Sequence, residues 1–268
     1  TMHTITDAEF GNFQRFIFDA AGITLSSAKK ALVSGRLAKR LQARRLGSFT
    51  EYFKLLSSGE DAEEVQTAVD LLTTNETYFF REPKHFELLR DVARDTAVRG
   101  QPFRIWSAAS STGEEAYSMA MTLADALPQQ PWEVIGSDIS TRVLQRARTG
   151  HYPLERTRHI PQHYLKRFCL KGIESQTGTL LVERSLRQKV SFTQVNLNAA
   201  LPTHLGTFDM IFLRNVMIYF NGDTKRQVVA RILATLKRGG HFCIGHSETL
   251  NDITDSLEQV APSIYRKP

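Results

Sequence analysis

The sequence predicts an α/β protein in which a doubly wound, mostly parallel sheet follows a small all-helical domain. Up to about residue 72 the apolar residues recur at helical spacing, whereas from Phe103 onward apolar runs typical of buried strands alternate with amphipathic helices. One segment, about 152–189, interrupts this alternation with turn residues between β-branched runs. We therefore expect a helical N-terminal domain at 1–83, a sheet domain at 84–268, and a small β-subdomain inserted in the sheet domain.

Four helices are expected in the N-terminal domain. The first follows a Thr6-x-x-Glu9 start signal and buries one apolar stripe, formed by Phe10, Phe13, Ile17 and Ala21. The other three are expected at Ala28–Leu46, Phe49–Leu56 and Asp61–Leu72. An aromatic connector at 73–83 then leads into a helix whose first turn accommodates Pro83. We expect this connector to pack at the seam between the two domains.

The second predicted helix carries an uneven charge. No acidic residue occurs from Ser26 to Thr50, while seven cations do: Lys29, Lys30, Arg36, Lys39, Arg40, Arg44 and Arg45. Uncompensated like charges one turn apart repel each other by roughly a few tenths of a kcal/mol per pair. An acidic partner would remove this repulsion, so we expect the helix to bind a protein or a nucleic acid. A solvated charged face is the alternative interpretation.

A turn of small residues separates the first predicted strand from the helix that begins near Glu114. Such a turn lets the backbone approach a ligand closely, and the helix N-terminus presents free N–H donors to it. Ser111 with Glu114, or Thr112 with Glu115, also has the spacing of a capping box. Helix initiation alone is therefore the alternative to ligand binding at this turn.

Six strands are expected in the sheet domain: Phe103–Ala108, Trp132–Ser137, Val190–Val195, Phe208–Leu213, His241–Gly245 and Ser263–Arg266. Ligands of doubly wound sheets bind beyond the carboxyl ends of the strands, so polar residues there are candidates for a site. Asp138 follows the second strand, and its carboxylate can accept both ribose hydroxyls of an adenosine-type ligand. Alternatively, Asp138 caps the helix that begins near Ser140.

Two further groups of residues follow strands. Asn196 and Leu197 come after the third strand, and Arg214, Asn215 and Tyr219 come after the fourth. The amides could read the edge of an adenine ring, and the apolar side chain could pack on its face. Each residue taken alone is equally consistent with an ordinary loop.

Composition narrows the class of protein. The 268 residues carry a net charge of +6 and two cysteines, Cys169 and Cys243, whose spacing suits neither a metal site nor a disulfide framework. His241 and His246 would point to opposite faces of a strand, so we expect no metal site. No apolar run approaches the roughly 18 residues of a membrane span, and the first residues lack a signal-peptide pattern. We expect a cytoplasmic protein that does not insert into the membrane.

Five motifs occur in order along nearly the whole chain. They are Thr-Thr-Asn-Glu-Thr-Tyr-Phe-Phe-Arg at 73–81, Ser-Ala-Ala-Ser-Ser-Thr-Gly-Glu-Glu at 107–115, Ser-Asp-Ile at 137–139, Arg-Asn-Val-Met-Ile-Tyr-Phe at 214–220 and Gly-His-Ser-Glu at 245–248. Together they resemble the bacterial chemotaxis-receptor glutamate methyltransferases, the CheR family. Two positions depart from the family's pattern: Ala116 stands where proline is frequent, and Leu213 where cysteine is frequent.

The resemblance implies an S-adenosylmethionine-dependent protein-glutamate O-methyltransferase, with S-adenosylhomocysteine as product. Its cofactor-binding residues would be Asn75, Thr77, Arg81, Glu115, Asp138, Asn196, Leu197, Arg214 and Asn215. Glu115 would hold the amino end of the methionine part, Asp138 the ribose, and Asn196 with Leu197 the adenine. Arg81 and Tyr219 would be catalytic, with Arg81 steering the substrate carboxylate through a bidentate contact.

The resemblance also implies the partners. The basic second helix would lie on the acidic methylation helices of a chemoreceptor, and no nucleic acid would be bound. The β-subdomain could dock a receptor tail or be a passive surface hairpin. A receptor glutamate is ionised at neutral pH and is itself the nucleophile, so no strong general base is required. Positioning of the two reactants, worth roughly 7–11 kcal/mol, would carry most of the rate.

Two other functions stay open. A nucleic-acid methyltransferase would also bind S-adenosylmethionine and use a basic domain, and its binding would collapse as salt rises. Against it, Val216 follows Asn215 where base-amino methyltransferases have a proline and an aromatic residue. A cofactor-binding adaptor without catalysis would keep Asp138 but make Arg81 and Tyr219 dispensable.

Overall fold

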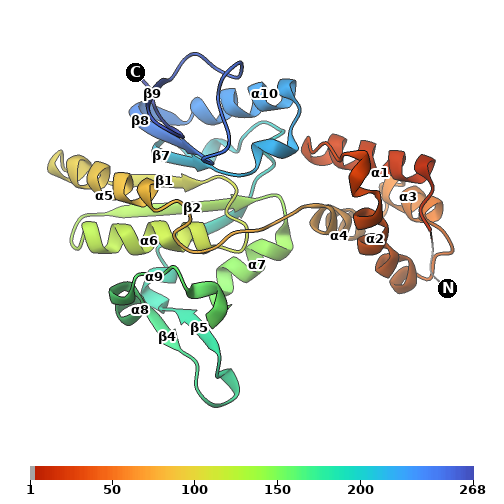
Figure 1. Cartoon of the computed structure of the whole chain (residues 1–268), viewed down its shortest axis with the longest axis horizontal. Helices are drawn as coiled ribbons and strands as arrows, with labels where there is room; N and C mark the ends of the chain where they lie inside the picture. Colours follow the sequence, from red (N-terminus) through yellow and green to blue (C-terminus); the bar gives the residue numbers. More distant parts are fainter. Residues whose placement is uncertain (1–3) are drawn as a thin grey trace.

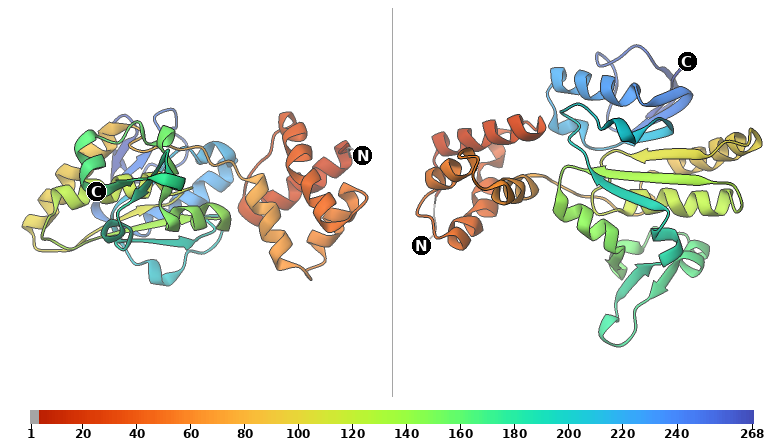
Figure 2. Two further views of the ribbon diagram at one scale, coloured as in Figure 1. Left: turned by 90° about the horizontal axis from the view of Figure 1, so that it is seen from below. Right: turned by 180° about the vertical axis from the view of Figure 1, so that it is seen from behind.

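The structure, a computed structural model, describes residues 4–268. Figure 1 shows a bundle of helices α1–α4 at one end of the long axis, a sheet with its helices at the centre, and a small β-subdomain that projects beside α6. The views in Figure 2 show the same three parts from below and from behind. The predicted fold class is confirmed, since the main sheet is mostly parallel and the insertion forms its own antiparallel sheet.

The helical bundle consists of α1 (Asp7–Ala21), α2 (Lys30–Arg44), α3 (Phe49–Ser57) and α4 (Ala62–Leu72). The start signal of α1 is a capping box: Thr6 Oγ1 accepts from the Glu9 amide at 3.1 Å, and Glu9 Oε1 accepts from the Thr6 amide at 3.0 Å. The ring of Phe13 lies edge-on to those of Phe49 and Phe53, with centroids 6.3 and 5.9 Å apart. These aromatic contacts join α1 to α3 in the core of the bundle.

The main sheet has the strand order β6-β2-β1-β7-β8-β10-β9. Its strands are β1 (Phe103–Ser107), β2 (Trp132–Asp138), β6 (Val190–Gln194), β7 (Phe208–Leu213), β8 (Leu236–Ile244), β9 (Glu258–Ala261) and β10 (Ile264–Arg266). The first five strands in that order are mutually parallel. At the β8 edge, β10 runs antiparallel to both of its neighbours, β8 and β9. Strand β9 escapes prediction because Glu258, Gln259 and Val260 are exposed and form no apolar run.

Helices cover both faces of the sheet, because successive strand residues point to opposite sides. On one face, Ile105 and Phe212 pack with α5 (Pro83–Val98) and α6 (Glu114–Ala126). On the other, Trp106 and Ile211 pack with α10 (Gly222–Leu233). The carboxyl ends of the parallel strands face the helical bundle (Figure 1). No helix within residues 4–268 is both long and apolar enough to cross a membrane.

The inserted β-subdomain follows α7 (Thr141–Thr149). Its three strands lie in the order β3 (His151–Pro153), β5 (Thr179–Val182) and β4 (Cys169–Lys171), with α8 (Gln162–Phe168) before β4 and α9 (Arg184–Arg187) after β5. The buried side chains of Tyr152, Tyr164 and Val182 belong to the same apolar core as α6. The subdomain is therefore packed on the sheet domain rather than extended from it as an isolated hairpin.

The expectation that the cations of α2 are uncompensated is wrong for three of them. Lys30 pairs with Asp7 at 2.6 Å, and Arg40 and Arg44 converge on Glu64 of α4 at 2.6 and 3.3 Å. The acidic partners lie on other helices, outside the acid-free stretch that motivated the expectation. Only packing of α1 and α4 beside α2 brings the opposite charges together.

Glu64 is a buried anion at the centre of this charge cluster. Its side chain is 1% exposed, and Oε2 accepts from Tyr52 Oη at 2.7 Å and from Arg40 Nε at 2.9 Å. Burial alone would raise the pKa of Glu64, but the hydrogen bonds and the charges of Arg40 and Arg44 hold it below its usual value. The resulting stabilisation is present above the pKa of the unfolded chain and is lost as pH falls through the folded pKa.

We expect Glu64→Gln to lower the free energy of unfolding by about 2–3 kcal/mol at pH 7, because Arg40 loses its anionic partner. This expected loss of stability is smaller than that for a fully buried ion pair, since the Arg40 side chain is 28% exposed. Urea unfolding followed by circular dichroism measures it. Glu63→Gln, an exposed neighbour on α4, is the control and should change stability by less than about 0.5 kcal/mol.

Protonation of Glu64 in the wild type removes the same interaction. The difference between Glu64→Gln and wild type should therefore shrink as pH falls below about 4. A difference that stays constant from pH 7 to pH 3 would contradict the assignment of this stabilisation to the carboxylate.

Candidate active site

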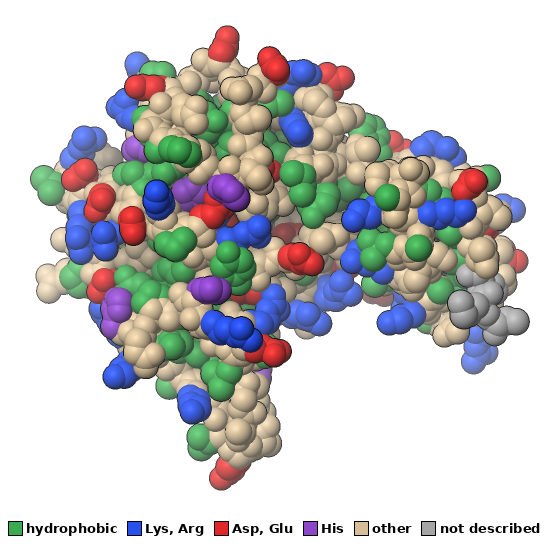
Figure 3. Space-filling model, viewed as in Figure 1, with side chains coloured by type: hydrophobic (Ala, Val, Ile, Leu, Met, Phe, Trp, Pro, Cys, Tyr) green, Lys and Arg blue, Asp and Glu red, His purple; other side chains and the backbone are tan. Residues whose placement is uncertain are grey.

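A cavity of about 590 Å³ lies between the helical bundle and the carboxyl ends of the parallel strands, and residues of both line it. Its walls come from five parts of the chain: 23–36, 72–81, 109–139, 214–219 and Ser247. A smaller cavity of about 60 Å³ shares Asp138 and Ile139 with the larger one. Figure 3 shows basic side chains gathered on this face where the bundle meets the rest of the molecule. This cavity is the candidate active site.

Most of the predicted site residues meet at these cavities. The larger cavity is lined by Asn75, Thr77, Arg81, Glu115, Asp138, Arg214, Asn215 and Tyr219, and the smaller one by Asn196 and Leu197. Of the seven cations on the basic helix, Lys29 and Arg36 line the larger cavity, while Lys30, Lys39, Arg40, Arg44 and Arg45 do not. Folding thus unites the connector with the strand ends but leaves most of the basic helix outside.

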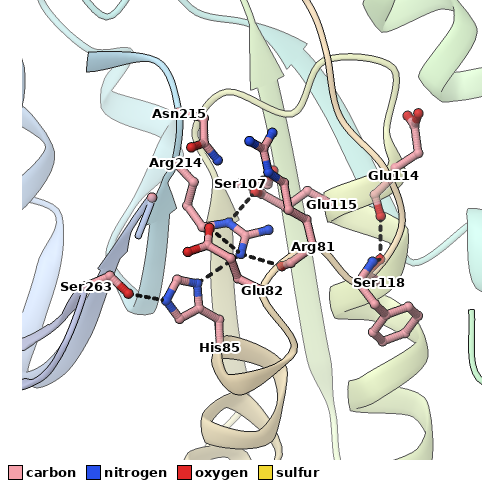
Figure 4. A network of polar contacts seen from close by, with 12 residues as sticks. Arg81, Glu82, His85, Ser107, Glu114, Glu115, Ser118, Arg214, Asn215 and Ser263 are labelled. Carbon is pink, nitrogen blue, oxygen red and sulfur yellow. Dashed lines mark hydrogen bonds and ion pairs between the residues drawn. The ribbon is translucent and has the colours of Figure 1, made fainter. Parts of the chain in front are cut away.

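The turn between β1 and α6 has its own backbone geometry. Gly113 is the N-cap of α6 with φ of 101°, and a Cβ there would lie 2.8 Å from Tyr152 Oη and 2.9 Å from Ala147 Cβ. Because glycine occupies the N-cap, neither capping box that the spacing allows is formed, and helix initiation does not explain the polar residues of this turn. Figure 4 shows Glu114 and Glu115 pointing to different sides of the helix.

Asp138 holds the turn in place through backbone amides. Its Oδ2 accepts from the Ser111 amide and its Oδ1 from the Ser140 amide, both at 3.0 Å. Ser140 itself is the N-cap of α7, so the alternative that Asp138 caps this helix is wrong. Burial raises the pKa of Asp138 to about 6, although the amide hydrogen bonds act to lower it. The carboxylate is therefore ionised at neutral pH, with lone pairs left for a ligand.

Arg214 is a buried guanidinium beneath the cavity. Its Nε donates to Glu115 Oε2 at 2.8 Å, and its Nη1 donates to the Arg81 carbonyl oxygen at 2.7 Å and contacts His85 Nδ1 at 2.9 Å (Figure 4). Ser107 Oγ donates to the other oxygen of Glu115 at 2.6 Å. Arg214 thus joins the end of β7 to α6 and to the connector, and its bond together with that of Ser107 orients the Glu115 carboxylate.

His85 was not among the predicted site residues. Its ring is 2% exposed, and burial, with the charge of Arg214, lowers its pKa to about 3. Since a guanidinium can only donate, Nδ1 is the acceptor, and Nε2 carries the proton that is donated to Ser263 Oγ at 2.8 Å. A single histidine in the first turn of a helix gives no sequence signal for this role, because its partners lie far along the chain.

Arg81 and Tyr219 lie on two segments that flank the cavity. Arg81 Nη1 donates to the Glu76 carbonyl oxygen at 3.4 Å, and its guanidinium carbon lies 5.6 Å from the centroid of the Tyr78 ring. Tyr219 is half-buried, and its pKa is raised by burial and by the charge of Glu76. Its carbonyl oxygen accepts from the Thr24 amide at 2.8 Å, which ties this loop to the helical bundle.

Asn196 is turned toward the helical bundle. Its Nδ2 donates to the Ala20 carbonyl oxygen at 2.8 Å, and its Oδ1 accepts from the Asn198 amide at 2.9 Å. Both polar groups of the side chain are therefore engaged by the protein. Leu197 contributes an apolar surface to the smaller cavity, as expected of a residue that packs on a ring.

Glu248 joins the loops that follow β7 and β8. Its Oε1 accepts from the amides of Asn215 and Gly245, both at 2.8 Å, and its Oε2 accepts from the Met217 amide at 3.1 Å. These bonds hold Asn215 in a left-handed conformation with φ of 61°. A Cβ on Gly245 would lie 2.4 Å from Asn215 Oδ1. The Gly-His-Ser-Glu motif at 245–248 marked Glu248 as part of a family pattern, but no spacing in the sequence showed that its carboxylate binds the loop of Asn215.

We expect Glu248→Gln to weaken binding of S-adenosylhomocysteine about tenfold, because the amide cannot accept from all three N–H groups and one buried donor is left unpaired. Isothermal titration calorimetry measures the affinity. Glu258→Gln, on an exposed edge strand, is the control and should bind as the wild type does. Equal affinities for Glu248→Gln and wild type would show that the loop does not depend on this carboxylate.

Comparison with known proteins matches the helical bundle and the sheet domain to the same protein family. The family model described as the CheR methyltransferase all-alpha domain matches residues 8–73, and that described as the CheR methyltransferase SAM binding domain matches residues 75–265. A protein named chemotaxis protein methyltransferase 2 from Pseudomonas aeruginosa is 44% identical over 262 residues, covering 97% of this chain and 93% of the relative. Chemotaxis protein methyltransferases from Escherichia coli and Salmonella typhimurium are 42% and 39% identical over 263 residues, covering 97% of this chain and 91% and 90% of the relatives.

The SAM-binding match covers each strand end that faces the cavity, and S-adenosylmethionine is thus the cofactor. The predicted family is confirmed by both matches and by the identity to relatives over nearly the full chain. The chain belongs to the CheR family of S-adenosylmethionine-dependent methyltransferases.

Proposed function

We propose that the protein transfers the methyl group of S-adenosylmethionine to glutamate side chains of chemotaxis receptors and forms glutamyl methyl esters. The relatives described above carry the name chemotaxis protein methyltransferase. One observation carries the proposal further, the charge of the two sides of the cavity. The sheet side presents two carboxylates, Glu115 and Asp138, against one cation, Arg214, whereas the bundle and connector present three cations, Lys29, Arg36 and Arg81, against one carboxylate, Glu76. A side with an excess of negative charge suits a sulfonium cofactor, and a side with an excess of positive charge suits a carboxylate substrate.

The residues of the sheet side fit the cofactor. Gly113 lets the turn pack closely against Tyr152 and Ala147, and Ser111 Oγ, in a residue that lines the cavity, is buried without a hydrogen-bond partner among the described residues. Asp138 would accept from the ribose hydroxyls, Glu115 would hold the amino end, and Leu197 would pack on the adenine. Residues Asn75, Thr77, Asn196, Arg214 and Asn215 would complete the pocket. The cofactor supplies a methyl group that its positively charged sulfur makes electrophilic.

The chain would orient the acceptor carboxylate rather than activate it. A glutamate carboxylate is ionised at neutral pH, so no proton has to be removed before it reacts. Arg81 and Tyr219 would steer this carboxylate, with the Arg81 guanidinium offering two parallel donors. Orientation of two reactants is worth roughly 7–11 kcal/mol, enough to carry most of the rate.

The receptor would contact only four of the seven cations on the basic helix. Lys29 and Arg36 line the cavity, and Lys39 and Arg45 are accessible, whereas Lys30, Arg40 and Arg44 are engaged within the bundle. The helical unit at 1–83 would thus present the acidic methylation helices to the methyltransferase unit at 84–268, in the cytoplasm. The β-subdomain at about 152–189 would take a receptor tail along its edge strand β4, beside the exposed Leu170 and Ile173.

The proposed reaction is tested by the product. Incubation with methyl-labelled S-adenosylmethionine and a receptor cytoplasmic fragment, followed by base, should release volatile labelled methanol from a carboxyl ester. Arg81→Ala should abolish this release, while Arg94→Ala, an exposed residue of α5, should leave it unchanged. Label that stays on the protein after base, or that appears only on added RNA or DNA, would overturn the proposal. Cofactor binding without any transfer would indicate the adaptor instead.

We expect the affinity for S-adenosylhomocysteine to fall roughly tenfold between pH 7 and pH 5, because the pKa of Asp138 is about 6 and only its ionised form accepts from both ribose hydroxyls. Affinity should reach a plateau above pH 7. Calorimetric titrations across this range measure the effect. Asp138→Asn should bind weakly with a flat profile, and the same slope in this variant would assign the titration to another group.

A further inference from the structure

The β-subdomain touches the turn that borders the cofactor cavity. Tyr152 of β3 is 2% exposed, and its Oη donates to the Thr112 carbonyl oxygen at 2.7 Å. The same hydroxyl lies 2.8 Å from the position of a Cβ on Gly113. A side chain of the insertion therefore limits both the carbonyl orientation and the residue type of the turn.

An ion pair between a half-buried arginine and a buried carboxylate forms a second link to this turn. Arg156, in the 3-10 turn after β3, pairs through Nη2 with Glu114 Oε2 at 2.9 Å. Glu114 is 0% exposed, and its other oxygen accepts from Thr112 Oγ1. Burial raises the pKa of Glu114, while the Thr112 hydrogen bond and the charge of Arg156 oppose this rise. Arg156 is thus the cation that compensates a carboxylate in the first turn of α6.

The subdomain also touches the connector that carries Arg81. The ring of Tyr152 lies edge-on to Phe79 with centroids 5.0 Å apart, and the ring of His159 lies 4.9 Å from that of Tyr78. Next along the connector, the Phe80 amide donates to Ser118 Oγ of α6 at 2.9 Å. Tyr152 therefore contacts both the turn before α6 and the connector.

We propose that Tyr152 and Arg156 are positioning residues, through which the β-subdomain sets the cofactor turn and the connector in the geometry that binds S-adenosylmethionine. Tyr152 acts on the Thr112–Gly113 backbone, and Arg156 acts through the carboxylate of Glu114. The subdomain then contributes to cofactor binding, and a partner bound to the subdomain changes the affinity of the cofactor site. The inference concerns cofactor binding, so it holds whichever acceptor is methylated.

The test compares minimal changes in the full chain. Tyr152→Phe removes one hydroxyl and keeps the ring packing, and Arg156→Gln removes the cation. We expect calorimetry to show binding of S-adenosylhomocysteine weakened about threefold to tenfold by each, with faster amide hydrogen exchange at 109–116. Arg158→Gln is the matched control, since Arg158 lies two residues further on and is exposed, and it should bind as the wild type does.

A double variant distinguishes positioning from a general loss of structure. If Arg156 acts through Glu114, then Glu114→Gln added to Arg156→Gln removes the uncompensated carboxylate and should regain affinity over Arg156→Gln alone. Wild-type affinity in both single variants, an equal loss in Arg158→Gln, or no recovery in the double variant would overturn the proposal. Should Arg156→Gln fail to fold, the affinity of Tyr152→Phe decides alone.

Discussion

The burial of the Arg214 guanidinium is the constraint on which the site depends. A cation removed from water is tolerated only where its donors are paired, and removal of one partner of such a group costs about 3–5 kcal/mol. Here Nε pairs with Glu115 and Nη1 reaches both the Arg81 carbonyl oxygen and His85. Meeting this requirement positions β7, the first turn of α6, the end of the connector and the start of α5 relative to one another. The need to pair this buried cation therefore fixes the position of the residues around Arg214, which itself lines the cavity.

The helical bundle is attached to the sheet domain beside the same cavity. Asp70 of α4 accepts from the amide and the hydroxyl of Thr141, both at 3.1 Å, and Gln66 donates to the Ile139 carbonyl oxygen at 3.1 Å, one residue after Asp138. On the opposite side, Ile23 pairs with Phe220. The bundle thus forms one wall of the site and is held there by polar bonds at two seams. Lys29 and Arg36 line the cavity, whereas Lys30, Arg40 and Arg44 pair with acidic residues of the bundle itself.

Most of the order of helices and strands was predictable because it depends on local patterns, with the exposed edge strand β9 as the exception. The apolar stripe of α1 and the capping box at Thr6 are visible within a few residues, and so are the strand ends at Asp138 and Arg214. The rule that ligands bind beyond the carboxyl ends of parallel strands then brings those ends together without coordinates. Charge compensation of Arg40 and Arg44 by Glu64 was not predictable, because it joins residues twenty or more positions apart on separate helices. The role of His85 was hidden for the same reason.

The sequence by itself determined the family, the cofactor class and many of the polar residues that line the cavity, because those are carried by motifs whose backbone geometry is local. Tertiary structure alone decided which of two adjacent carboxylates faces which partner: Glu115 turns to Arg214, whereas Glu114 turns to Arg156 of the inserted subdomain. Adjacent residues of a helix differ by about 100° in direction, so a one-residue difference chooses between two separate environments. Pattern reading cannot make that choice, since the energy of a buried charge depends on the partner that the completed fold places beside it.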